Sequence, residues 1–133
     1  MAGISPDEYF ARDRFGTAIG ARFVSLHDGV CVYEYDATAA HHNPGGMLHG
    51  GALYSVMDSS QGMLVYSLVE PPNVAATGTA TIKYLAPVVR GNIVVTTTLT
   101  KREGRKLFLH SEAVDENRVM VAVLDEVWIT LRG

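Results

Sequence analysis

The most regular hydrophobic pattern in the chain lies in residues 49–69. Apolar side chains recur there at steps of three and four residues, which is the spacing of one face of an α-helix. The segment contains no proline, and the pair Pro71-Pro72 follows it, where a helix cannot continue. Because the segment is apolar around most of its circumference, we expect a helix of about 20 residues buried inside the fold. The recurring positions are Leu53, Val56, Met57, Leu64 and Leu68.

The residues before this helix predict short elements. Residues 5–12 have the form of a short helix, with Ser5 as its N-cap and a proline at its first position. Residues 19–26 and 30–37 indicate two strands that pair around a tight turn. Residues 39–47 are rich in turn-forming residues and are expected to form a loop.

The residues after the helix have the pattern of β-strands to the end of the chain. In the last strand, alternation predicts that Val119, Val121 and Val123 share one face. The expected strands cover 76–86, 92–101, 106–114 and 119–131, separated by turn residues.

Consecutive antiparallel strands after a single buried helix predict an α+β fold, in which one curved sheet wraps around one long central helix. The length of 133 residues predicts one domain over 1–133, and 47% hydrophobic residues suffice for its core. Such a sheet has edges that must be protected, and edge-to-edge pairing of two copies is a common way to do so.

Composition narrows the expected location and partners. The longest apolar run, Val119–Leu124, is too short to span a membrane. We read no secretory signal at the start, and the single Cys31 excludes an internal disulfide framework and any multi-cysteine zinc site. We therefore expect a cytoplasmic protein with no membrane partner. The net charge of −3 argues against general nucleic-acid binding.

Positive charge is concentrated in residues 83–106, where six basic residues stand against one acid, Glu103. This segment is either a solvated surface or a site for a compact anion such as a nucleotide phosphate. The basic residues are Lys83, Arg90, Lys101, Arg102, Arg105 and Lys106.

Candidate chemistry begins at the entrance of the long helix, where Gly50 and Gly51 follow His49. Glycine is costly inside a helix, but it allows a ligand to approach the backbone closely. The N–H groups of a first helical turn have no intrahelical partner, and the helix dipole is positive there. The entrance can therefore stabilise a carbonyl oxygen that gains negative charge during acyl transfer. The alternative is a glycine pair that only fits a tight turn.

Asp58 is an acid in the middle of the helix that we expect to be buried, where a carboxylate needs a partner or a function. Alternatively, Asp58 is an N-cap that restarts a broken helix. Gly50 and Asp58 lie eight residues apart, which places them about 12 Å apart along one helix and about 80° apart around it. If both act on one substrate, they must come from different copies of the chain.

Other catalytic and binding patterns are weak. His41, His42 and His49 are close in sequence but lack the HExxH spacing and a supporting acid, so we expect no metal. His49 is expected to shape the helix entrance through hydrogen bonds. There is no nucleotide-binding glycine motif and no GxSxG motif, which argues against a bound dinucleotide and a serine hydrolase.

The segment Asn43, His49-Gly50-Gly51 and Asp58, with the strand around Thr77–Tyr84 and the Gly104–Lys106 hairpin, resembles the hotdog-fold acyl-CoA thioesterases of the phenylacetate-degradation type. The resemblance covers about residues 40–130. It implies a hotdog fold, two subunits that join their sheets, pairing of dimers into a dimer of dimers, and hydrolysis of a CoA thioester. Coenzyme A would be part of the substrate, with no separate cofactor.

The resemblance also implies roles for individual residues. The Gly50 N–H would polarise the thioester carbonyl, with Asn43 and His49 supporting that site. Asp58 of the partner subunit would activate water as a general base, or attack as a nucleophile, and Thr77 would position the water. Charge, rather than the family, suggests which residues bind the CoA phosphates. The predicted substrate-binding set is Gly51, Arg90, Lys101, Arg102, Arg105 and Lys106.

Two other functions fit parts of the pattern. An acyl-carrier-protein dehydratase uses a histidine before Pro-Gly, as in His42–Gly45, but its acid would fall at Val56. A hydratase-type dehydratase on the same fold is no better supported. A non-catalytic acyl-CoA sensor would not need Asp58. The surroundings of Tyr54, Met57 and Met63 are apolar and do not select among acyl groups.

Overall fold

The computed structural model describes residues 3–133, so the first two residues of the predicted domain lie outside the described residues. The long helix and the strands occur where the sequence pattern predicts them, with shifts of a few residues at their ends. The elements are α1 (Pro6–Arg12), α2 (Arg14–Ala18), β1 (Arg22–His27), β2 (Val30–Ala37), the 3₁₀ turn η1 (Ala39–His41), α3 (Gly50–Leu68), β3 (Val74–Tyr84), β4 (Gly91–Glu103), β5 (Lys106–Asp115) and β6 (Met120–Leu131).

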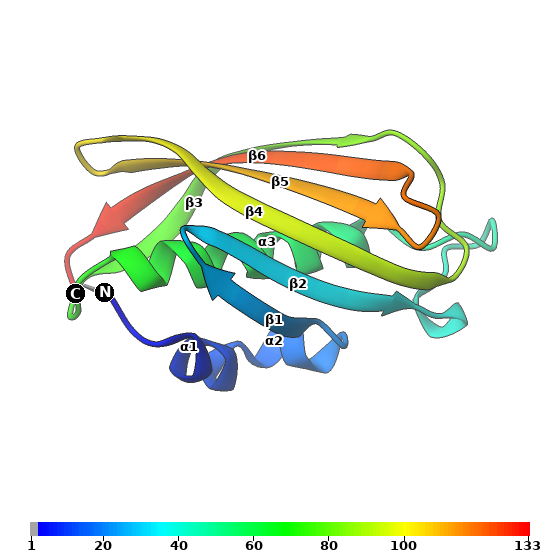
Figure 1. Cartoon of the computed structure of the whole chain (residues 1–133), viewed down its shortest axis with the longest axis horizontal. Coiled ribbons are helices and arrows are strands. Elements are labelled where there is room, and N and C mark those ends of the chain that lie inside the picture. The colour runs from blue at the N-terminus through cyan, green and yellow to red at the C-terminus, as the bar shows by residue number, and fades with distance from the viewer. Residues whose placement is uncertain (1–2) are drawn as a thin grey trace.

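The strands form one antiparallel sheet of six strands in the order β1-β2-β4-β5-β6-β3. The sheet curves over α3, and the short helices α1 and α2 lie on the other side of α3 (Figure 1). This is the predicted α+β arrangement of a sheet wrapped around a central helix. The strand that follows α3 in sequence, β3, pairs only with β6 and forms an edge of the sheet.

The central helix is continuous and enclosed. It begins after His49, whose side chain accepts a hydrogen bond from the Gly51 N–H, and it ends at Leu68. Every residue from Ser59 to Val65 is buried, so this part of α3 has no solvent-exposed face. Asp58 lies within the helix, and the alternative in which it caps a second helix is therefore wrong.

Polar residues in the buried part of α3 are paired with the sheet. The Ser60 hydroxyl lies 2.8 Å from the Thr97 hydroxyl, which in turn lies 2.6 Å from the Ser111 hydroxyl. The Gln61 side-chain amide donates to Ser111 Oγ at 3.0 Å. These contacts satisfy groups that would otherwise be costly to bury, and they fix the helix against β4 and β5.

The N-terminal segment covers α3 on the side away from the sheet. Ser5 caps α1 as predicted, accepting from the Glu8 N–H at 3.2 Å. The sequence analysis did not predict α2, which Asp13 caps by accepting from the Gly16 N–H at 3.0 Å. A Cβ at Gly16 would lie 2.6 Å from Ser59 Oγ, so glycine allows this close contact with α3.

The prediction that Val119, Val121 and Val123 share one face of the last strand is wrong. Val119 precedes β6 and is exposed, whereas Val121 is fully buried. Ala113 of β5 pairs with Ala122 and Val114 pairs with Met120, so Val121 is an extra residue in a β-bulge. The bulge shifts the alternation by one residue, and the even positions from Ala122 onward face α3.

The contact between the N-terminal segment and α3 can be tested at Gly62, where a Cβ would overlap the Tyr9 hydroxyl. We expect Gly62→Ala to lower the free energy of unfolding by about 1–3 kcal/mol, although alanine is the better helix former by about 1 kcal/mol. Urea denaturation measures the change. Adding Tyr9→Phe removes the hydroxyl and should recover part of the loss; an equal loss in both backgrounds would contradict this packing.

Candidate active site

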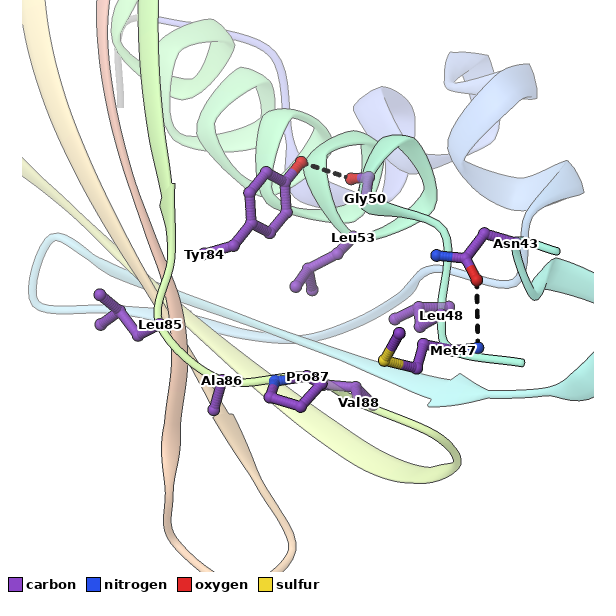
Figure 2. A pocket seen from close by; sticks show the side chains of 10 residues that line it. All are labelled: Asn43, Met47, Leu48, Gly50, Leu53, Tyr84, Leu85, Ala86, Pro87 and Val88. Carbon is purple, nitrogen blue, oxygen red and sulfur yellow. Dashed lines mark hydrogen bonds between the residues drawn. The ribbon is translucent and has the colours of Figure 1, made fainter. Parts of the chain in front are cut away.

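The loop before α3 is organised by Asn43. Its side-chain oxygen accepts from the backbone N–H groups of Gly45 and Met47, at 2.9 and 3.2 Å. Its own backbone N–H donates to the Met47 carbonyl at 2.7 Å. The side-chain nitrogen of Asn43 points toward a pocket at the entrance of α3 (Figure 2). Asn43 therefore supports the predicted site in two ways, by fixing the loop and by lining the pocket.

The pocket has a volume of about 350 Å³ and opens at the first turn of α3. Gly50 lies at its upper edge, and the Tyr84 ring stands beside it (Figure 2). Most of the lining side chains are apolar, which suits an acyl group better than a charged one. The lining residues are Asn43, Met47, Leu48, Gly50, Leu53, Tyr84, Leu85, Ala86, Pro87 and Val88.

Gly50 offers the pocket a backbone donor. Among residues 3–133, no protein group accepts a hydrogen bond from its N–H. The Tyr84 hydroxyl donates to the Gly50 carbonyl at 2.7 Å, and a Cβ at Gly50 would lie 3.0 Å from the Tyr84 ring. A larger residue here would make a tight contact that the exposed Tyr84 side chain would have to relieve by shifting slightly. A free N–H at the positive end of a helix can polarise a carbonyl oxygen.

The predicted role of His49 in shaping the entrance fits its hydrogen bonds. Its Nδ1 accepts from the Gly51 N–H at 2.9 Å, so this nitrogen carries no proton. Its backbone N–H donates to the His41 carbonyl at 2.8 Å. Because the Gly51 N–H is already paired, Gly50 has the available N–H of the two glycines.

The neighbouring histidines also have structural partners. The His41 ring hydrogen-bonds to the Tyr35 hydroxyl, and the His42 ring lies 2.6 Å from the Val89 carbonyl. Within the described part of the chain there is no group of three side chains that could hold a metal ion.

Asp58 and Thr77 come together in one protomer. Asp58 is half-buried in the middle of α3, and Thr77 lies on β3 beside a bulge. The Thr77 hydroxyl donates to Asp58 Oδ1 at 3.5 Å. Burial raises the pKa of Asp58, while hydrogen bonds from Glu126 and Thr77 act in the opposite direction. An aspartate in this setting is a stronger base than an exposed one.

Glu126, which was not among the predicted site residues, lies on the face of β6 that points toward α3. Its side chain is 2% exposed, and it interacts with Asp58. The Tyr54 hydroxyl donates to Glu126 Oε2 at 2.8 Å, and Trp128 Nε1 donates to Oε1 at 2.9 Å. Burial and the Asp58 charge raise the pKa of Glu126 to about 8. In the sequence, Glu126 alternates with the apolar residues Leu124 and Trp128, and this pattern could have indicated that its side chain faces the core.

The structure does not bring Asp58 and Gly50 together within one protomer. Both lie on the continuous helix α3, which separates them by about 12 Å along its axis. The pocket beside Gly50 is not lined by Asp58. This helix geometry agrees with the prediction that Gly50 and Asp58 of the same chain cannot both contact one substrate carbon.

The basic residues do not form a single patch in one protomer. Arg90 immediately precedes β4, whereas Lys101 and Arg102 lie near its other end, more than about 30 Å away along the strand. Arg105 and Lys106 lie at the turn that follows. Lys101 is also paired, with its Nζ 3.0 Å from Glu103 Oε1. The basic residues that are close in sequence thus lie at two separate places in the fold.

A comparison with known families assigns the chain to one of them. The profile described as thioesterase superfamily matches residues 45–122. The chain belongs to the thioesterase superfamily. The matched segment contains Gly50, Asp58 and Thr77, whereas Asn43 and Glu126 lie outside it.

Individual proteins are similar to this chain in sequence or in fold. The acyl-coenzyme A thioesterase PaaI of Escherichia coli K12 is 24% identical over 115 residues, covering 86% of this chain and 80% of PaaI. The solved structure of E. coli PaaI, from the phenylacetic acid degradation operon, matches with a TM-score of 0.87, 22% identity, and coverage of 96% and 91%. The conserved protein PA5202 from Pseudomonas aeruginosa matches with a TM-score of 0.81, 27% identity, and coverage of 89% and 94%.

Two predictions are confirmed by these comparisons. The sheet wrapped around α3 is the hotdog fold, and the protein is a thioester hydrolase. None of the helices within residues 3–133 is long and apolar enough to cross a membrane.

The hydrogen bond at the entrance of α3 makes a prediction about stability. We expect His49→Ala to lower the free energy of unfolding by about 1 kcal/mol, because the Gly51 N–H loses its partner. His49→Asn should retain most of the stability, since asparagine is a good N-cap. Thermal and urea unfolding of both variants measure the difference. Equal stability of the alanine and wild-type proteins would contradict a capping role.

Proposed function

We propose that the protein hydrolyses an acyl-CoA thioester to a carboxylic acid and free CoA. The observation that carries this proposal is Asp58, a half-buried carboxylate on the central helix of a thioesterase fold with the Thr77 hydroxyl beside it. The name of the relative in E. coli supports CoA as the carrier of the acyl group. Coenzyme A arrives with the substrate, and we infer no other cofactor.

The proposed reaction begins with the thioester carbonyl in the pocket, where its oxygen accepts from the Gly50 N–H. Asp58 and Thr77 hold a water molecule, and Asp58 takes one proton from it as the oxygen attacks the carbonyl carbon. Collapse of the tetrahedral intermediate breaks the carbon–sulfur bond, and the CoA thiolate leaves and takes up the proton held by Asp58, which regenerates the base. In the alternative, Asp58 attacks the carbon itself and the carbon–sulfur bond breaks with loss of the CoA thiolate. Water then hydrolyses the resulting anhydride to the free acid and the Asp58 carboxylate. Both routes need an ionised Asp58.

The two groups are proposed to come from different subunits of a homodimer. β3 is an edge strand of 11 residues, and nearly all of them are exposed. A long edge without a partner strand favours pairing with another strand. Antiparallel pairing of two β3 strands creates a two-fold axis that inverts one protomer relative to the other. Gly50 of one protomer would then face Asp58 of the partner subunit. We further propose that two dimers pair.

The proposed two-fold dimer would also bring the two groups of basic residues, which lie apart in one protomer, to the same place. Arg90 follows the pocket residue Val88, so it lies at the Gly50 end of its own protomer. The β4–β5 hairpin lies at the opposite end, near the end of β6, whose Thr130 N–H donates to the Arg105 carbonyl. In a two-fold dimer the partner's hairpin is at the Gly50 end. We propose that Arg90 and the basic residues of that hairpin, from Lys101 to Lys106, bind the CoA phosphates.

The acyl group is proposed to enter the apolar pocket beside Gly50. Met57 and Met63, which the sequence analysis placed near the acyl group, are almost completely buried in the core and do not line this pocket. The pocket side chains Met47, Leu48 and Leu53 suit an aryl or medium-chain acyl group. A buried, reduced Cys31 is consistent with the proposed cytoplasmic location.

Asp58→Asn tests the proposed base while keeping the size of the side chain. We expect turnover of acyl-CoA to fall by at least about 100-fold, because the amide cannot accept the proton. In the wild type, kcat/KM should fall as the pH decreases through an Asp58 pKa that lies above its ordinary value. Thiol release from acyl-CoA substrates measures both. Asp125→Asn, on the exposed face of β6, is the control. Wild-type turnover by Asp58→Asn would contradict the assignment.

Mixed dimers test whether the site is shared. Gly50→Pro removes the N–H at a helix position that tolerates proline, and Gly50→Ala adds the Cβ but keeps the N–H. Gly50→Pro and Asp58→Asn should each be inactive alone. After random exchange at equal concentrations, about one quarter of wild-type activity should return, because half of the dimers contain one intact site. Absence of recovery in dimers shown to have exchanged would contradict the shared site.

A further inference from the structure

Glu126 is a buried acid that the proposed reaction does not use. Its neighbours along the inner face of β6 are Leu124 and Trp128, and only 2% of its surface is exposed. A carboxylate in such surroundings is costly unless positive charge or hydrogen-bond donors stabilise it. The Tyr54 hydroxyl and Trp128 Nε1 supply two such donors, so the charge state of Glu126 depends on its other neighbours.

The charges near Glu126 are acidic. Asp58 of α3 acts on Glu126 directly, and Asp13, at the junction of α1 and α2, acts on Asp58. Within the described residues, no lysine or arginine is among the groups that act on either carboxyl group. The uncharged groups that face the pair are Tyr54 of α3, Tyr9 of α1, Thr77 of β3 and Trp128 of β6.

Two carboxyl groups in contact without a nearby cation cannot both be ionised at low cost. Tyr54, whose hydroxyl donates to Glu126, lies one helical turn before Asp58 on α3, so both carboxyl groups lie against the same face of the helix. A hydrogen bond between the two carboxyl groups requires a proton on one of them. Asp58 is half-buried, whereas Glu126 is almost completely buried. The proton therefore belongs on Glu126, and the charge belongs on Asp58.

We propose that Glu126 is a positioning residue that keeps its proton at neutral pH and donates it, in a hydrogen bond, to the Asp58 carboxylate. This inference deepens the proposed function and rests on it, since Asp58 is the proposed base. The Glu126 O–H and the Thr77 O–H both donate to Asp58, so they fix its orientation and favour its ionised form. Hydrogen bonds from Tyr54 and Trp128 hold the Glu126 carboxyl group in place.

The proposal has a consequence at alkaline pH. At neutral pH the pair carries one proton and one negative charge. As the pH rises through the Glu126 pKa of about 8, the proton is lost, Asp58 loses a donor and a second negative charge appears beside it. The orientation of Asp58 is then no longer fixed, and we expect kcat to fall over this range while KM changes little.

The first experiment measures the proton directly and does not depend on activity. The protein is labelled with ¹³C at the glutamate side-chain carboxyl carbons. Their NMR signals are followed from about pH 4 to about pH 10, a range that includes both the ordinary pKa of glutamate and the raised pKa of Glu126. The signal missing from Glu126→Gln identifies Glu126. We expect it to titrate near pH 8, and at lower pH in Asp58→Asn. Titration in the ordinary glutamate range would overturn the proposal.

The second experiment measures the role in catalysis through the pH dependence of kcat. Glu126→Gln keeps a donor that cannot ionise, so it should retain kcat within about fivefold at neutral pH and lose the alkaline decrease near pH 8. Glu126→Ala removes the donor and should lower kcat by at least about 10-fold with little change in KM. Tyr54→Phe removes a donor to Glu126, so the alkaline decrease should move to higher pH.

Glu112→Gln, on the neighbouring strand β5 and partly exposed, is the matched control and should keep the wild-type pH profile. Thermal unfolding of each variant identifies a loss of folding. If the alkaline decrease persists in folded Glu126→Gln, Glu126 does not act on Asp58 through its proton. If Asp58→Asn is fully active, the proposed function fails, and the NMR titration still decides where the proton lies.

Discussion

Enclosure of α3 is the constraint on which the rest of the structure depends. The curved sheet covers the helix on one side and the N-terminal helices cover it on the other, so residues Ser59–Val65 are all buried. Every polar group on this part of the helix must therefore find a partner inside the protein. Ser60 and Gln61 find theirs on the sheet. Asp58, at the margin of the enclosed region, accepts from Thr77 and, in the proposal, from a protonated Glu126.

The same helix distributes the proposed chemistry. Its first turn presents the free Gly50 N–H to an apolar pocket, and its middle presents the carboxylate of Asp58. The rise of an α-helix keeps these two groups about 12 Å apart, whatever the surrounding side chains do. In the proposed mechanism, a single chain therefore holds two half-sites, and the exposed edge of β3 is the surface through which two chains complete them.

Much of the fold could be predicted because the periodic patterns of α3 and of the strands are strong. The missed parts have specific physical causes. The helix α2 is short and contains Gly16 and Thr17, which are poor helix formers, so its stability comes from the Asp13 cap and from packing. Glu126 was missed because Val119, Val121 and Val123 alternate regularly in the sequence and suggest that the odd positions of β6 face the core. The bulge at Val121 shifts the alternation, so the even positions face the core instead.

The candidate site was predicted in part. Asn43, His49 and Gly50 are local to one loop, so their proximity follows from the sequence. Thr77 could be paired with Asp58 only through the family resemblance, because a contact between a helix and a distant strand depends on the register of the sheet. The basic residues were grouped because they are close in sequence, but the length of β4 separates Arg90 from the hairpin.

The most direct test of a shared site is a crystal structure of the dimer with a thioether analogue of acyl-CoA, which lacks the reactive thioester. The account predicts the acyl end of the analogue in the pocket, within hydrogen-bond reach of the Gly50 N–H of one protomer. Asp58 of the partner subunit should lie close enough to place a water molecule about 3–3.5 Å from the reacting carbon. A structure in which the Asp58 groups of both protomers lie far from the bound acyl group would contradict the account.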